Sequence, residues 1–240
     1  MRRRFFVEKF ENQQAVMEGE AAHHLGRVLR AQVGQLYELS DGASVWLAEI
    51  ANVGRERVQF RLVEALPAHK SSLETVLLLA VVKFDSFEWA LEKATELGIL
   101  DIVPLAAERS EKGLLVAARK RAERWQRILR EASQQSRRVQ LPNLHGVVSP
   151  EAAFTHFQGG VRVMLSESAE ARPLKMVLGG AAERAVLAIG PEGGWTDAEF
   201  ATARKAGFAE ASLGRLILRT ETAVVAALAS INFAFTADLA

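Results

Sequence analysis

Apolar and polar positions follow one pattern up to residue 70 of the chain and another beyond it. In the first part, short apolar segments, some alternating with polar residues, are separated by turn signals such as Asp41-Gly42. This pattern is typical of short β-strands. The expected strands are Arg4–Val7, Leu36–Ser40, Val45–Ile50 and Arg57–Glu64. With one short helix at Ala21–Leu29, the segment predicts a small β-barrel.

After a polar, proline-containing linker at Pro67–Ser72, strand-like and helix-like segments alternate. Thr75–Val82 is a continuous apolar run, typical of a strand covered on both faces. Asp85, with Glu88 three residues later, predicts a capping box at the start of a helix that ends before Gly98. Further strands are expected at Ile99–Val103, Val161–Leu165, Ala185–Ile189 and Ala211–Leu213, and further helices at Ala117–Ser136, Ala198–Ala206 and Glu221–Ala237. The alternation predicts a mainly parallel α/β sheet, so the chain divides into domains 1–70 and 73–240.

The amino-acid composition excludes several classes of protein. The chain has 240 residues, of which 49% are hydrophobic and 25% charged, as in a globular protein. It has no cysteine, which excludes disulfides, thiolate catalysis and cysteine-bound metals. No apolar run approaches the ~18 residues of a membrane span, and the first residues lack a secretory signal. We therefore expect a cytoplasmic protein that uses no metal.

Charge is balanced over the whole chain but concentrated in one segment. The formal net charge is +1, yet Arg109–Arg138 carries ten basic and three acidic residues, so the remainder is net negative. A concentrated positive face suits a polyanionic partner such as RNA, because its cations release the counterions of the phosphates. The alternative is an ordinary solvated helix face.

The stretch Val186–Glu199 contains the clearest candidate for ligand binding. An apolar strand runs into Gly190-Pro191-Glu192-Gly193-Gly194 and then into a helix capped by Thr196, with Glu199 at the capping-box position. Ligands of open α/β sheets lie at the carboxyl edge of the strands, where glycines let a ligand approach the backbone. The stretch is neither a dinucleotide fingerprint nor a phosphate-binding P-loop. An ordinary turn between strand and helix is the alternative.

The stretch Leu213–Ala223 is the second candidate. A strand end, a glycine and an apolar tripeptide lead through Arg219-Thr220-Glu221-Thr222 into an almost wholly apolar helix. Glu221 suits the positive end of that helix. Arg219 either pairs with Glu221 structurally or contacts a phosphate or a substrate base. Because the helix is apolar on more than one face, burial in a homodimer interface is expected.

These two stretches, together with Trp89–Gly98 and Glu131–Ser136, resemble the bacterial 16S ribosomal RNA uridine-N3 methyltransferases of the knotted SPOUT superfamily. The resemblance covers essentially the full chain, with the motifs in the family's order. It implies an N-terminal PUA-like β-barrel that grips RNA, followed by an α/β methyltransferase domain with a C-terminal trefoil knot. It also implies a homodimer through the C-terminal domain, and 16S rRNA within the 30S subunit as the partner.

The resemblance further implies that S-adenosylmethionine binds among the knot loops, without a metal. The implied cofactor-binding residues are Leu165, Ile189, Gly190, Pro191, Glu192, Gly193, Gly194, Leu213, Gly214, Leu216, Leu218, Arg219 and Thr222. Glu221 is the candidate base for the uridine N3 proton, and Arg219 the candidate stabiliser of the uridine anion. The expected RNA contacts are Arg27, Arg30, Arg109, Arg137 and Arg138.

The chain departs from the family pattern at a few positions. Lys83–Phe87 lacks the glycine and one basic residue of the family's Lys-Gly-Asp-Lys-Met, and Leu216 stands where many members have arginine. Gln134–Arg138 reads Gln-Gln-Ser-Arg-Arg where many members read Glu-Gln-Ser-Gly-Arg. These departures bear on individual RNA contacts, whereas the cofactor loops are intact.

Two other functions are compatible with the sequence. One is a SPOUT enzyme acting on transfer RNA or on a ribose 2′-hydroxyl; the other is a non-catalytic RNA-binding protein with vestigial glycine loops. A Rossmann oxidoreductase is more distant, because its nucleotide fingerprint is absent.

Overall fold

The computed structural model describes residues 3–69 and 71–235. The chain forms two compact units: Met1–Lys70 with Ser133–Leu141, and Ser71–Ala132 with Pro142–Ala240. The ends of the expected domains at residues 1, 70 and 240 lie outside the described residues. Within the described ranges, no helix is both long enough and apolar enough to cross a membrane.

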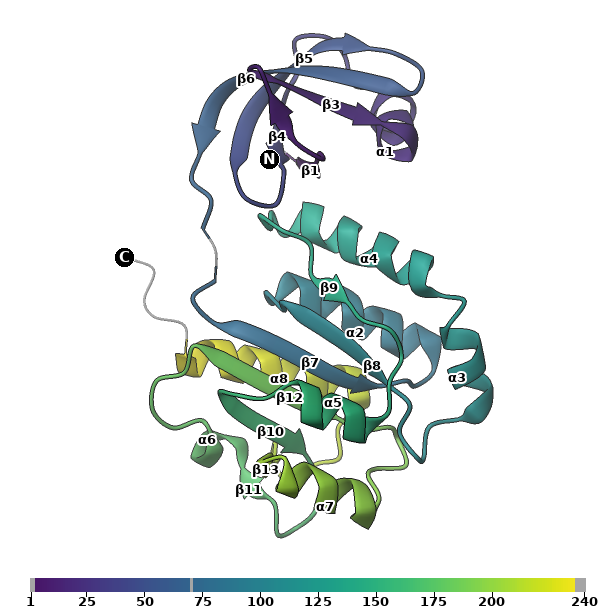
Figure 1. Ribbon diagram of the computed structural model, residues 1–240, viewed down its shortest axis with the longest axis vertical. Coiled ribbons are helices and arrows are strands. Elements are labelled where there is room, and N and C mark those ends of the chain that lie inside the picture. Colours follow the sequence, from purple (N-terminus) through teal and green to yellow (C-terminus); the bar gives the residue numbers. More distant parts are fainter. Residues whose placement is uncertain (1–2, 70, 236–240) are drawn as a thin grey trace. The chain divides into compact units, whose positions relative to one another are not determined.

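The first unit is built on one six-stranded sheet with the order β1-β4-β5-β6-β3-β2. Figure 1 labels β1, β3, β4, β5 and β6 of this sheet. Its strands are β1 (Arg4–Phe6), β2 (Phe10–Glu11), β3 (Gln14–Glu18), β4 (Leu36–Ser40), β5 (Val45–Val53) and β6 (Arg57–Leu66). Strands β1 and β4 are parallel and the other pairs antiparallel. The expected barrel is thus a half-barrel, with β1 and β2 at the two edges of the sheet as described.

The sequence predicted four of these strands and missed the hairpin of β2 and β3. Asn12 and Gln13 connect the two strands with φ angles of 48° and 62°. Such left-handed turns usually carry glycine, so this pair gives little sequence signal. The expected helix at 21–29 is a short α1 (Gly19–His23) continued by the π-helical turn η1 (His24–Val28).

The second unit contains a seven-stranded sheet with the order β11-β13-β10-β12-β7-β8-β9, in which every pair is parallel. The strands are β7 (Glu74–Ala80), β8 (Asp101–Leu105), β9 (Asn143–Leu144), β10 (Val161–Leu165), β11 (Arg172–Pro173), β12 (Arg184–Ile189) and β13 (Ala209–Ser212). The expected parallel α/β sheet is confirmed.

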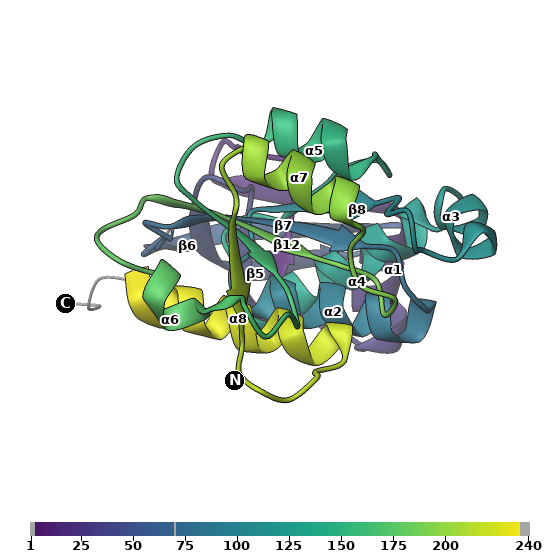
Figure 2. The ribbon, with the colours of Figure 1, turned by 90° about the horizontal axis from the view of Figure 1, so that it is seen from below.

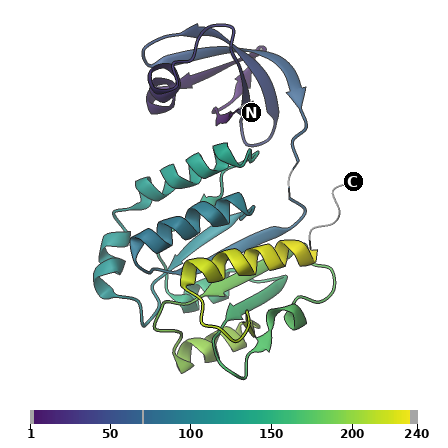
Figure 3. The ribbon, with the colours of Figure 1, turned by 180° about the vertical axis from the view of Figure 1, so that it is seen from behind.

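Helices cover both faces of this sheet. Helices α5 (Pro150–His156) and α7 (Asp197–Lys205) lie on one face, and α2 (Phe84–Glu96) and α8 (Thr220–Phe235) on the other (Figure 2). Helix α8 runs beside α2 (Figure 3). Helix α6 (Leu174–Val177) is a single turn. This arrangement buries the central strands on both sides.

Strand β7 shows how the core is divided. Leu77 and Leu79 belong to the apolar cluster under α2 and α8, whereas Val76 and Leu78 belong to the cluster under α5 and α7. Alternate residues of a strand point to opposite faces, and all four side chains are fully buried. The uninterrupted apolar run at 75–82 therefore reflects a strand packed on both faces.

Two expectations about helices were wrong. The capping box at Asp85 is absent: α2 begins at Phe84, after Lys83, and its first residues receive no side-chain cap. Glu88 instead accepts hydrogen bonds from Arg121 and Arg124. The single helix expected at 117–136 is two helices, α3 (Lys112–Ala118) and α4 (Ala122–Gln135).

Candidate functional site

The carboxyl ends of β10, β12 and β13 lie level at one edge of the second unit's sheet. Met164 of β10 pairs with Ala188 of β12 on one side and with Glu210 of β13 on the other. The segments that follow Leu165, Ile189 and Ser212 therefore leave the sheet at the same height. Because this edge is where open α/β sheets bind ligands, the two glycine-containing stretches of the sequence meet at the expected place.

The loop after β12, residues 190–195, is held tightly at both of its ends. Gly194 has φ +70° and its amide donates to the carbonyl of Pro191 over 2.8 Å, which closes a tight turn. Trp195 is buried, and its indole Nε1 donates to the carbonyl of Leu165 over 3.1 Å. A Cβ added to Gly190 would lie 3.0 Å from the Trp195 ring. The loop after β12 is thus fastened to the end of β10.

The loop after β8 supports the same glycine loop from another side. Arg109 Nη1 donates to the carbonyl of Gly193 over 2.8 Å. The capping box of α7 is confirmed, with Thr196 and Glu199 bonded reciprocally. Glu199 Oε1 also accepts the backbone amide of Glu108 over 2.9 Å. The sequence did not predict these links, since only the register of the strands brings residues 108 and 109 beside residues 193 and 199.

The second stretch, between β13 and α8, is far more open. A Cβ added to Gly214 would meet no atom within 4 Å, and most residues from Gly214 to Arg219 are exposed. Leu216 and Ile217 are 82% and 80% exposed. Thr222, in the first turn of α8, is also exposed, whereas Glu221 is half-buried there. A helix N-terminus carries partial positive charge, which favours the Glu221 carboxylate.

The expected cofactor-binding residues therefore fall into two environments. Leu165, Ile189 and Pro191 are buried at the strand ends, while Glu192 and Gly193 are exposed. The expected residues on the second stretch, from Leu213 to Thr222, are half-buried or exposed. Such an edge offers exposed backbone amides and carbonyls beside apolar side chains, which suits an organic ligand with polar groups. Within residues 3–69 and 71–235, no cluster of histidine and carboxylate side chains fit to hold a metal is present.

The expected RNA contacts are divided between the two units. Arg27 and Arg30 are exposed in the first unit, at η1 and just after it. Arg137 and Arg138 belong to the first unit as well, because the segment Ser133–Leu141 is part of it. Arg109 is exposed in the second unit, where its guanidinium contacts Gly193. The sequence placed Arg137 and Arg138 in the second domain together with Arg109, and this placement was wrong, because the segment after α4 packs with the first unit.

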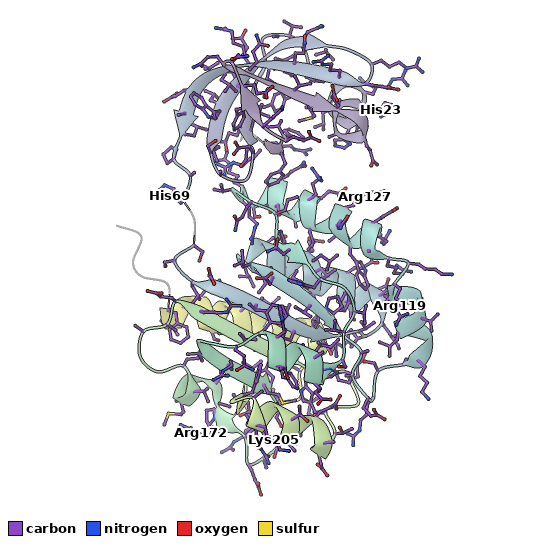
Figure 4. All side chains as sticks on the ribbon, in the orientation of Figure 1. His23, His69, Arg119, Arg127, Arg172 and Lys205 are labelled. Carbon is purple, nitrogen blue, oxygen red and sulfur yellow. The ribbon has the colours of Figure 1, made fainter. Side chains whose placement is uncertain are left out.

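The basic segment that begins at Arg109 is carried mainly by α3 and α4. Arg119 follows the end of α3 and is exposed, and Arg127 lies on α4 (Figure 4). The opposite side of α4 is apolar, with Trp125 and Leu129 buried. Helix α4 is thus amphipathic, with Trp125 and Leu129 on its buried side.

Comparison with known proteins assigns each unit to a family. Residues 69–232 match the model of an RNA methyltransferase domain, and residues 18–63 match an RNA methyltransferase PUA domain. The first match covers most of the second unit, and the second covers β4, β5 and most of β6 of the first unit.

Individual relatives carry the same description. The chain is 36% identical over 219 residues to ribosomal RNA small subunit methyltransferase E of Synechocystis, covering 88% of this chain and 70% of that protein. The Bacillus subtilis protein of the same name is 29% identical and covers 90% of this chain and 88% of the relative.

Solved structures agree over the whole length. The crystal structure of ribosomal RNA small subunit methyltransferase E of Neisseria gonorrhoeae, bound to S-adenosyl methionine, has a TM-score of 0.88 at 28% identity and covers 98% of both chains. A Legionella pneumophila protein solved with bound S-adenosyl methionine has a TM-score of 0.87, with the same identity and coverage. The chain belongs to the family of the ribosomal RNA small subunit methyltransferases E, which join a PUA domain to an RNA methyltransferase domain.

Proposed function

We propose that this chain transfers the methyl group of S-adenosylmethionine to N3 of a uridine in 16S ribosomal RNA. The observation that carries the proposal is the meeting of the Gly190–Gly194 and Leu213–Arg219 loops at one sheet edge, in register with the end of β10. Two proteins of the same fold have S-adenosyl methionine bound in their solved structures. The position of methylation comes from the resemblance of the sequence motifs to the uridine-N3 family.

The residues at this edge fit the proposed cofactor. Gly193 and Gly214 expose backbone without a side chain, and the space beside Gly214 is open. Leu216 and Leu218 supply apolar surface for an adenosine ring. Leu165, Ile189 and Arg219, with the rest of the two loops as far as Thr222, complete the proposed set. When bound, S-adenosylmethionine supplies an electrophilic methyl group on its sulfonium.

Glu221 and Arg219 are the proposed catalytic pair. Glu221 sits in the first turn of α8, beside the exposed loop, and would accept the proton that leaves uridine N3. Arg219, exposed at the entry to α8, would stabilise the negative charge that develops on the uracil ring. The methyl group then bonds to N3, and the sulfur keeps the electron pair of the broken bond.

The remaining proposals concern topology and partners. The all-parallel sheet, with the segments after β10, β12 and β13 leaving it at the same edge, supports the trefoil knot of the SPOUT superfamily. Arg27, Arg30, Arg109, Arg137 and Arg138 are proposed to contact 16S rRNA in the 30S subunit, in the cytoplasm. Exposed Leu216, Ile217 and Phe233 of the second unit support a homodimer.

The first test is calorimetric titration of S-adenosylmethionine into the wild type and into Gly193→Trp. A Cβ at Gly193 would already lie 3.3 Å from Arg109 Cβ, so an indole there has to fill the face of the loop. We expect saturable binding to the wild type and none to the variant. Gly146→Trp, at an exposed glycine with no atom near its Cβ position, is the matched control and should bind normally.

The second test maps methylated nucleotides in 16S rRNA from cells that lack the protein. We expect one uridine to lose its N3-methyl group and to regain it when purified protein and S-adenosylmethionine are added to 30S subunits. Loss of a methyl group from transfer RNA, or from a ribose, would identify a different substrate. An unchanged methylation pattern would favour a non-catalytic RNA-binding protein.

A further inference from the structure

The turn that follows α4 has an unusual backbone. Arg137 has a φ of 56°, in the left-handed region that residues with a Cβ adopt rarely. The residue is not glycine, asparagine or aspartate, so its own preferences do not explain the conformation. Such a conformation persists only where the surrounding structure fixes it, and such positions cluster at functional sites.

A buried ion pair of the sheet holds this residue by its backbone. Arg4 Nη1 donates to the carbonyl of Arg137 over 2.5 Å, while Arg4 Nε and Nη2 donate to Glu38 Oε2 over 3.1 and 2.9 Å. Arg4 and Glu38 are each only 8% exposed. The second carboxylate oxygen, Glu38 Oε1, lies 3.7 Å from Arg137 Nη2. Backbone and side chain of Arg137 are thus both fixed by one pair.

The next residues of the turn are held by the same face of the sheet. Ser40 Oγ donates to the carbonyl of Val139 over 2.5 Å, and Val139 is buried. Glu38 and Ser40 are two residues apart on β4 and so point to the same side. Arg4 lies directly opposite Glu38 in the parallel pair of β1 and β4. Arg4, Glu38 and Ser40 form what we call the turn seat.

The turn held by the seat carries two neighbouring cations, Arg137 and Arg138. Burial lowers the pKa of Arg138 to about 10, so that its guanidinium remains charged at neutral pH. A charge that is partly withdrawn from water attracts a phosphate more strongly than a fully solvated one. Arg4 itself is too buried to reach an RNA strand. Its hydrogen bond to Arg137 therefore acts on the turn and not on a ligand.

We propose that Arg4 and Glu38 are positioning residues that fix the left-handed turn at Arg137 and thereby set how Arg137 and Arg138 meet 16S rRNA. This inference rests on the proposed function for its ligand. It assigns a role in RNA recognition to two residues of the sheet that do not touch RNA.

The variant Arg4→Lys tests whether Arg4 positions the turn at Arg137. A lysine keeps a positive charge beside Glu38, but its single ammonium cannot replace the fork that joins Glu38 to the Arg137 carbonyl. We expect affinity for transcribed 16S rRNA to fall about tenfold, through KM with kcat unchanged, and S-adenosylmethionine affinity to stay the same. Arg61→Lys, in the exposed pair with Glu49 on the same sheet, is the control and should change neither. A normal KM for Arg4→Lys would overturn the proposal.

A rescue experiment separates positioning from general stability. Glycine adopts positive φ without strain, so Arg137→Gly lets the turn form without the seat, although it removes one cation. In the Arg137→Gly background, Arg4→Lys should therefore weaken RNA binding less than about twofold, against about tenfold in the wild-type background. The same loss in both backgrounds would contradict the proposal.

Trypsin gives a readout that needs no RNA. Cleavage after Arg137 or Arg138 requires the turn to open locally. We expect Arg4→Lys to be cut there several-fold faster than the wild type, and Arg61→Lys at the wild-type rate. Equal cleavage rates in Arg4→Lys and the wild type would show that the turn seat does not hold the turn closed. If the wild type failed to bind 16S rRNA while this difference held, the proposed function would fail and the seat would remain.

Discussion

Gly190 shows how closely single residues are fitted around the glycine loop. The indole of Trp195 lies against its backbone and at the same time donates to the carbonyl of Leu165. A side chain at position 190 would push the indole away from that carbonyl. The loop after β12 would then lose its attachment to the end of β10.

Gly190→Ala should lower the free energy of unfolding by about 1–3 kcal/mol, because the added methyl group overpacks a buried contact. Affinity for S-adenosylmethionine should fall with it, since the loop is displaced. Urea denaturation and calorimetry measure the two effects. Gly146→Ala, where the added Cβ meets nothing within 4 Å, is the control. Equal stability of Gly190→Ala and the wild type would show that Trp195 can move freely.

For single residues, the sequence predicted which positions belong to the candidate site but not which other residues they contact. The run Gly190–Gly194 indicates close backbone approach, and its position after a strand was predicted. That Arg109 would contact Gly193 was not predictable, because nothing in residue spacing shows which loops of the sheet are neighbours. Arg137, which replaces the glycine of many family members, has the φ of 56° that a glycine there would favour.

At the scale of elements, α2 and the start of α4 are fastened by one carboxylate. Glu88 accepts hydrogen bonds of 2.8 Å from both Arg121 and Arg124, and Arg121 also lies over the Phe84 ring, 3.9 Å from its centre. The hydrogen bond from Arg124, and then that from Arg121, hold the pKa of Glu88 below its usual value against the effect of burial.

Glu88→Gln should lower the free energy of unfolding by about 1–2 kcal/mol at pH 7. Because the folded-state pKa of Glu88 is lowered, the stabilisation is complete above the usual pKa of a glutamate and is lost as the pH falls through the lowered value. The gap between wild type and variant should therefore shrink in acid. Denaturation curves from about pH 7 to about pH 3 measure it.

Glu92→Gln, on the same helix but in a more exposed pair with Lys93, is the matched control for this change. Its effect should be below about 0.5 kcal/mol, as for most surface ion pairs. A gap between wild type and Glu88→Gln that widened toward low pH would show that the carboxylate is not stabilised in its ionised form.

The contacts of Glu88 also explain why the boundary between α3 and α4 was not predicted from the sequence. Residues 117–136 contain no glycine or proline, so their composition predicts one helix. The chain instead breaks between Ala118 and Ala122, where Arg121 turns to Glu88 and Phe84. Strand β10, at Val161–Leu165, was predicted to the residue, because four of its five residues are apolar and its last three are buried.

At the scale of the whole molecule, the chain passes between its two units more than once. Ser133–Leu141 groups with Met1–Lys70, although the whole stretch Ser71–Ala132 separates them in sequence. The change in the pattern of apolar and polar positions near residue 70 marks one boundary between the units. It does not indicate that Ser133–Leu141 returns to the first unit. Buried contacts such as Ser40 with Val139 carry the grouping, and only the folded chain reveals them.

Apolar side chains left exposed on the second unit bear on its assembly. Helix α8 buries Val224, Leu228 and Ile231, whereas Phe233 near its end is 94% exposed. Leu216 and Ile217 of the preceding loop are exposed as well. Large exposed apolar side chains commonly mark an interface, and a symmetric dimer would cover the same residues on both copies.

Sedimentation velocity should therefore give a dimer for the wild type at micromolar concentration and a shift toward monomer for Phe233→Glu. A carboxylate at that position would be buried without a partner, and in a twofold interface it would occur on both copies. Val116→Glu is the control, because Val116 is 70% exposed on α3 of the same unit and should leave the dimer intact. A dimer that survives Phe233→Glu would place the interface elsewhere, and a monomeric wild type would mean that these exposed apolar side chains do not form a dimer interface.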